Sequence, residues 1–274
     1  MSYSYSIDKY DVTNNQYVEF LNTKDPTGAN ALGLWNSNMG GPGSQFGGIS
    51  LNPGNANGSK YTVDQGDGNH PVFNATWYSA ARFGNWLNNG QGNGTTESGA
   101  YNLPPGSPAN GGAIGRSAGA TIFLPSENEW YKAAYYNPAT SSYFTYGTGS
   151  SLAPSPVAPT SSPNAANYAG VLGTLTDVGA YSGSASPYGL FDMTGNAFQW
   201  TDTIYFDNPN ARYVRGGGAT NTLLDSSSGS RIPSNAASVG YAFRVASIPE
   251  PSSVVLATFG VAGFAAWGWR RRKR

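Results

Sequence analysis

The chain of 274 residues is long enough for one large domain, and its formal net charge of zero conceals an uneven distribution. The last five residues are all basic, and without them ten basic residues stand against fifteen acidic ones, a net charge of −5. A mildly acidic body has no basic face for phosphate backbones, so nucleic acid is excluded as an expected partner. The chain contains no cysteine, which excludes disulfides, thiolate metal sites and cysteine nucleophiles.

Three helix-start signals occur along the chain. The first and third are capping boxes, in which Gln16 and Glu129 stand three residues after a hydroxyl-bearing cap residue. The second signal precedes an apolar face that begins at Trp77. Three modest helices are therefore expected to start directly after Thr13, Thr76 and Ser126.

Strands and loops fill most of the remaining length. Apolar and alternating patterns predict short strands, and Gly, Asn, Ser and Pro predict long loops between them. The combination indicates a loop-rich α+β domain over residues 1–247. The expected strands cover residues 3–7, 101–103, 121–124, 213–215 and 242–246, and the expected loops cover 26–69 (with one hairpin), 88–120 and 147–166.

One stretch, residues 188–200, organises the chain. Its aromatic and aliphatic residues surround the pair Gly195-Asn196, and both residue types tolerate a positive φ. The stretch therefore predicts a buried segment with a tight bend. Such a bend turns carbonyl and side-chain oxygens to one side, as a hard cation requires, but the residues alone favour a structural turn in the core.

This stretch resembles the signature of the formylglycine-generating enzyme / sulfatase-modifying factor family. The resemblance implies that family's fold, a C-type-lectin-like variant with little regular structure. Five further segments resemble family motifs in the expected order, namely residues 7–17, 71–83, 124–130, 215–218 and 240–245.

The resemblance implies an oxidase chemistry that these residues do not support. Family oxidases convert a substrate cysteine to formylglycine with a copper-binding pair of cysteines, placed between the fifth and sixth motifs. The corresponding interval, residues 219–239, contains serines and Arg231 but no cysteine, so copper is not expected. A three-histidine iron site is excluded because His70 is the only histidine, which we interpret as structural or at the surface. No catalytic residue is predicted.

The resemblance also implies structural calcium. Mapped by position, one site would use the side chains of Asp192 and Gln199 with the carbonyl groups of Gly195 and Ala197. A second site would use Asn167 and the carbonyl group of Tyr168. A network of side-chain hydrogen bonds in the same turn remains the alternative to both sites.

The C-terminal segment, residues 248–274, has a composition of its own. Pro249, Glu250 and Pro251 precede an uncharged run over residues 252–269 and the basic end. At about 1.5 Å per residue, this run spans roughly 27 Å, enough for a transmembrane helix across a bilayer core. The basic end would hold the C-terminus in the cytoplasm before processing, with the domain facing the periplasm or cell exterior.

The arrangement resembles the PEP-CTERM sorting signal of Gram-negative bacteria. That resemblance implies export, recognition by an exosortase, and association with the membrane, the cell surface and exopolysaccharide. Residues 1–6 lack the basic and apolar regions of a signal peptide, so we expect the true start of the gene to lie upstream.

Two functions follow, of different classes. The first is a non-catalytic, calcium-stabilised binding module for an extracellular polysaccharide or protein ligand. The second is an oxidoreductase of the formylglycine-generating type, acting on a protein or small thiol substrate through a cleft lined by Trp130, Arg231, Arg244 and the serines of residues 226–230. A purely structural matrix protein is a third, weaker interpretation.

Overall fold

The computed structural model describes residues 3–41, 46–104 and 114–249. Pro249 of the predicted sorting motif lies within this range, whereas Glu250, Pro251 and the predicted membrane helix over 252–269 lie outside the described residues. Among the residues described, no helix is long and apolar enough to cross a membrane.

All three predicted helices are confirmed. Each one starts at the cap residue expected from the sequence, and both capping boxes form with the reciprocal hydrogen bonds that define them. The helices are α1 (Asn14–Lys24), α2 (Trp77–Asn88) and α3 (Glu127–Tyr135), with short 3₁₀ turns at η1 (Ser37–Met39) and η2 (Leu223–Ser226).

Within the described residues, the strands form two three-stranded sheets and three two-stranded ribbons. One sheet has the order β1-β12-β4, with bounds Ser6–Ile7, Ala246–Ser247 and Ile122–Phe123. The second has the order β11-β10-β9, with bounds Ile232–Asn235, Asn208–Arg215 and Gln199–Tyr205. The ribbons pair β2 (Ile49–Leu51) with β3 (Tyr61–Val63), β5 (Tyr136–Asn137) with β6 (Ser142–Tyr143), and β7 (Ser155–Pro156) with β8 (Ala165–Ala166).

Four of the five predicted strand segments overlap a strand of the structure, but most differ from it in extent. Residues 3–7 form a strand only at β1, and residues 242–246 contribute only their last residue to β12. The expected strand at 101–103 is a single bridge from Tyr101 to Arg116. The hairpin expected within 26–69 is β2–β3. The long strand β9, which begins inside the organising stretch, was not predicted.

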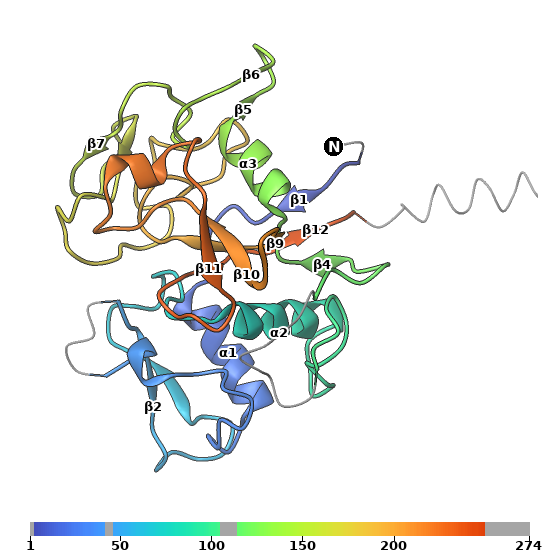
Figure 1. Ribbon diagram of the computed structural model, residues 1–274. Helices are drawn as coiled ribbons and strands as arrows, with labels where there is room; N and C mark the ends of the chain where they lie inside the picture. Colours follow the sequence, from blue (N-terminus) through green and yellow to red (C-terminus); the bar gives the residue numbers. More distant parts are fainter. Residues whose placement is uncertain (1–2, 42–45, 105–113, 250–274) are drawn as a thin grey trace, which may run out of the picture.

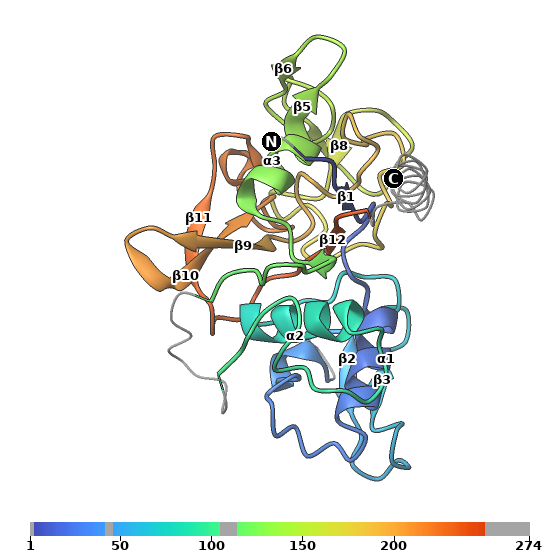
Figure 2. The same ribbon diagram turned by 90° about the vertical axis from the view of Figure 1, so that its right-hand side faces the viewer.

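The molecule has two halves that share one core. Helices α1 and α2 with the β2–β3 ribbon form one half, while α3 and the β9–β10–β11 sheet lie in the other (Figures 1 and 2). Two buried tryptophans join the halves: Trp77 of α2 donates to the carbonyl oxygen of Thr201 at 3.1 Å, and Trp200 of β9 donates to that of Ala75 at 2.9 Å. This shared core fixes the organising stretch against α2.

An ion-pair cluster joins α3 to its surroundings. The Arg116 guanidinium lies 2.8 Å from a carboxylate oxygen of Glu129 and 2.8 Å from one of Asp202. The Tyr3 hydroxyl donates to the other oxygen of Glu129 at 2.6 Å. Burial alone would raise the pKa of Glu129, but hydrogen bonds from Arg116 and Tyr3 lower it to about 2. Glu129 therefore contributes most to stability when it is ionised.

This cluster predicts a loss of stability in acid. Because the folded-state pKa of Glu129 lies below its unfolded value, its contribution is complete above about pH 4.5 and is lost as the pH falls toward 2. Glu129→Gln should lower the free energy of unfolding by on the order of 3 kcal/mol at pH 7 and by much less near pH 2. Urea unfolding at both pH values measures the difference. The exposed Glu19→Gln serves as control, and an equal loss at both pH values would refute the role of the charge.

Candidate functional site

The bend of the organising stretch has the backbone conformation expected from its sequence. Gly195 and Asn196 have φ values of 79° and 63°, and Asp192 has a φ of 58°. A Cβ on Gly195 would lie 2.4 Å from the carbonyl oxygen of Asn167, so only glycine fits there. The bend thereby presses against the segment that contains Asn167.

The Gln199 side chain is fully buried and fully hydrogen-bonded. Its oxygen accepts from the Trp130 indole at 2.6 Å and from the Arg244 guanidinium at 2.7 Å. Its nitrogen donates to the carbonyl oxygen of Asp192 at 2.8 Å and to the Asp11 carboxylate at 3.3 Å. Arg244 also forms an ion pair with Asp11 at 3.1 Å, and neither side chain is exposed.

Asn167 and Asn196 form a second polar pair beside this network. The amide nitrogen of Asn167 donates to the side-chain oxygen of Asn196 at 3.1 Å and to the carbonyl oxygen of Thr174 at 2.8 Å. The side-chain oxygen of Asn167 is buried, and none of the described residues gives it a hydrogen-bond partner. The Tyr168 hydroxyl donates to the carbonyl oxygen of Pro154 at 2.5 Å. The orphaned oxygen of Asn167 is therefore the notable feature of this pair.

The two predicted calcium sets differ in how well they fit a cation. In the first set, both acceptor positions of the Gln199 oxygen hold N–H donors, and the Asp192 carboxylate accepts from the Gly179 amide at 2.7 Å. The carbonyl oxygen of Gly195 accepts from the Ala197 amide at 2.9 Å. These contacts fit a hydrogen-bonded turn better than a cation site. In the second set, the buried oxygen of Asn167 accepts no hydrogen bond from the described residues, and it is of the hard oxygen type that calcium takes as a ligand.

The other metal-ligating side chains do not gather. Within residues 3–41, 46–104 and 114–249, no group of three or more His, Asp or Glu side chains is placed to hold a metal ion. His70 lies 3.3 Å from Asp67 and 3.7 Å from Asp177, which agrees with the structural interpretation of this residue.

The cleft suggested for an oxidoreductase is not open. Trp130 and Arg244 have no exposed surface, and Ser226 is also fully buried, so the expectation that they line a cleft was wrong for these three. The Ser226 hydroxyl packs so close to Gly217 that a Cβ there would lie 2.0 Å away. Arg231 is exposed, with its guanidinium 4.8 Å from the centre of the Tyr213 ring, and Ser227, Ser228 and Ser230 are half-buried. Ser226 is the buried member of the serine cluster.

Asp11 was missed by sequence reasoning. It is fully buried against Arg244 and Gln199, at the end of a charged segment that reads as surface. Asp11 follows Asp8 by three residues, but this spacing gives no indication of a contact with Arg244, which lies more than 230 positions further along the chain.

The geometry of the bend and the order of the motifs define a class of protein, and comparison with known families identifies it. The sequence model of the sulfatase-modifying factor enzyme 1-like domain matches residues 2–247, and the chain belongs to this family. The PEP-CTERM protein-sorting motif matches residues 247–273, which indicates an exported surface protein recognised by exosortase sorting machinery. The comparison with curated proteins finds no match.

Solved structures share the fold at low sequence identity. CarF is 20% identical with a TM-score of 0.59, and the match covers 90% of this chain and 87% of CarF. Treponema denticola variable protein 1 is 19% identical with a TM-score of 0.51, covering 89% and 84%. PvdO from Pseudomonas aeruginosa is 17% identical with a TM-score of 0.52, covering 89% and 80%. These matches confirm the mixed helix and strand fold of the family.

The bend at Gly195 predicts a matched pair of substitutions. Gly195→Ala adds a steric conflict with the Asn167 carbonyl group to the cost of a left-handed alanine, and should lower the free energy of unfolding by about 3 kcal/mol or more. Gly189 has a similar φ of 81° but open space around it, so Gly189→Ala should cost only about 1 kcal/mol. Chemical denaturation measures both, and equal losses would contradict the close packing at Gly195.

Proposed function

We propose that this chain is a non-catalytic member of its family, exported to the cell surface as a binding module for an extracellular ligand. The observation that carries the proposal is the complete absence of cysteine from the 274 residues. Copper(I) chemistry on a thiol substrate needs soft thiolate ligands, and serine hydroxyls cannot replace them. The single histidine removes the alternative of a three-histidine iron site.

The packing of the interior supports the same proposal. Gln199 holds Trp130 and Arg244 in buried hydrogen bonds, which leaves neither side chain available to a substrate. Ser226 is buried against Gly217 where the family's thiol chemistry would be expected. In this proposal the domain keeps the fold of the family, and Trp130, Arg244 and Ser226 stabilise that fold.

The sorting signal indicates where the ligand would be met, namely outside the cell. We propose that residues 252–269 form the membrane helix, with the domain facing outward and the basic end in the cytoplasm before processing. A matrix polysaccharide is the ligand that this setting favours. The C-type-lectin-like description of the fold belongs to the same proposal, since the matched structures establish only the family's mixed helix and strand fold.

The non-catalytic assignment predicts a negative result with a clear control. The full chain in mild detergent, incubated with copper and a peptide carrying Cys-x-Pro-x-Arg, should leave the peptide mass unchanged because no thiolate is present to bind the metal. A cysteine-containing family oxidase in the same buffer supplies the positive control. Mass spectrometry that finds formylglycine in the peptide would overturn the proposal in favour of the oxidoreductase.

The calcium part of the proposal rests on Asn167. Its unpartnered buried oxygen and the nearby carbonyl group of Tyr168 supply hard oxygen ligands. Millimolar calcium should raise the melting temperature relative to chelator, and Asn167→Ala should abolish this rise because the ligand is lost. Gln199→Glu tests the first calcium set, because it places a carboxylate at position 199. Equal melting temperatures of the wild type with calcium and with chelator would refute the calcium site.

A further inference from the structure

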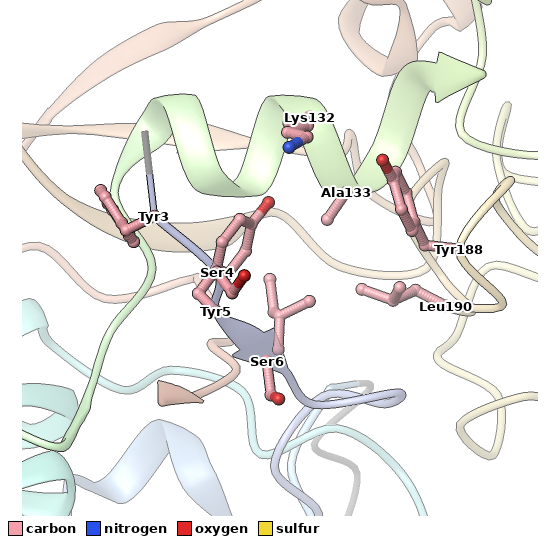
Figure 3. A pocket seen from close by; sticks show the side chains of 9 residues that line it. Tyr3, Ser4, Tyr5, Ser6, Lys132, Ala133, Tyr188 and Leu190 are labelled. Carbon is pink, nitrogen blue, oxygen red and sulfur yellow. The ribbon is translucent and has the colours of Figure 1, made fainter. Parts of the chain in front are cut away.

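A cavity of about 390 Å³ lies between the N-terminal segment and α3 (Figure 3). Tyr3 and Tyr5 form one wall, Lys132 of α3 lies above it, and Tyr188 and Leu190 close the far end. Its volume falls within the range of about 300–1,000 Å³ typical of small-molecule sites. We call this cavity the tyrosine groove and define it by Tyr3, Tyr5, Lys132, Tyr188 and Leu190.

Two rings of the groove, those of Tyr3 and Tyr188, are exposed, and hydrogen bonds hold Tyr3 and Tyr5 in place. Tyr3 and Tyr188 are 44% and 46% exposed. The hydroxyls of Tyr3 and Tyr5 donate to the carboxylate and to the backbone carbonyl of Glu129 at 2.6 and 2.7 Å, and their rings meet edge to face at 6.2 Å. Rings fixed in this way lose little conformational freedom when a ligand stacks on them.

The groove carries a single charge. Lys132 is its only charged lining residue, and no ion pair of Lys132 is found in the part of the chain that the structure describes. Burial raises the pKa of Tyr3 to about 12 and also raises the pKa of Tyr5 and Tyr188, so these hydroxyls are uncharged at neutral pH. The groove therefore presents neutral hydroxyls and apolar ring faces beside one ammonium group.

Tyrosines continue from the groove into the ribbon that follows α3. The groove is lined by Lys132 and Ala133 of α3, and strand β5 of the β5–β6 ribbon begins directly after this helix, at Tyr136. Tyr143 is 51% exposed, and its ring lies 5.1 Å from that of Tyr136. A row of this kind suits an elongated ligand with repeating units.

We propose that the tyrosine groove binds a saccharide chain that carries carboxylate groups. Tyrosine rings stack on the apolar faces of sugar rings, the hydroxyls of Ser4, Ser6 and the tyrosines offer hydrogen bonds, and Lys132 pairs with a carboxylate. The inference rests on the proposed function as a binding module and names its ligand class and site. A peptide ligand fits less well, because the edge strand β1 has only two residues to pair with an added strand.

The test measures binding of oligogalacturonate and of its methyl ester by calorimetry, with the full chain in uncharged detergent. The two ligands share ring faces and differ in charge. Tyr188→Ala should weaken binding of both by about tenfold or more, because the stacking ring is lost. Lys132→Gln should lower the affinity for oligogalacturonate alone, to about the affinity for its methyl ester. It should also make the affinity for oligogalacturonate independent of salt concentration. Tyr188→Phe keeps the aromatic ring and removes the hydroxyl, so it distinguishes the contribution of stacking from that of hydrogen bonding.

Two control variants make the same kinds of change at residues that do not line the groove. Phe206→Ala removes an aromatic side chain that is 77% exposed in the turn between β9 and β10, and Lys60→Gln removes a lysine charge beside β3. Both should bind like the wild type. Losses equal to those of the groove variants would overturn the assignment of the site.

The remaining outcomes separate this inference from the proposed function. If the wild type binds oligogalacturonate but the groove variants bind it equally well, the groove is wrong and the binding module stands. If the wild type binds soluble peptides and neither saccharide, the ligand class is wrong. Formylglycine in the peptide assay with copper would instead overturn the proposed function itself.

Discussion

The fold depends on one buried amide. Gln199 accepts hydrogen bonds from Trp130 and Arg244 and donates to Asp192 and Asp11, so one side chain joins α3, β9, the closing segment and the start of the chain. Burial raises the pKa of Asp11 to about 7, although Arg244 opposes this shift. A buried ion pair depends on additional hydrogen bonds, and the amide donates one to Asp11 and accepts one from Arg244.

The parts of the fold that the sequence predicted are those governed by local chemistry. The cap residues Thr13, Thr76 and Ser126 specify each helix start through hydrogen bonds that reach only three residues ahead. Strand β9 was missed because residues 199–205 become a strand by pairing with β10, whose other edge pairs with residues 232–235. Such pairing depends on context rather than on local preference.

The candidate site divides in the same way. The positive φ at Gly195 and Asn196 was predicted and is confirmed, because it is a property of those residue types. The contact of Asp11 with Arg244 could not be predicted, since it joins opposite ends of the chain. The absence of cysteine is the strongest functional statement that the sequence makes, and the structure adds that Ser226, within the corresponding interval, is buried against Gly217.

The position of β12 has a mechanical consequence. The sorting segment follows this strand, and β12 is the middle strand of its sheet, bonded to β1 on one side and β4 on the other. A pull transmitted through a surface attachment must therefore break both ladders together and cannot peel an edge strand away. Arg244, two residues before β12, then carries the load into the buried ion pair with Asp11, so tension is resisted by the core.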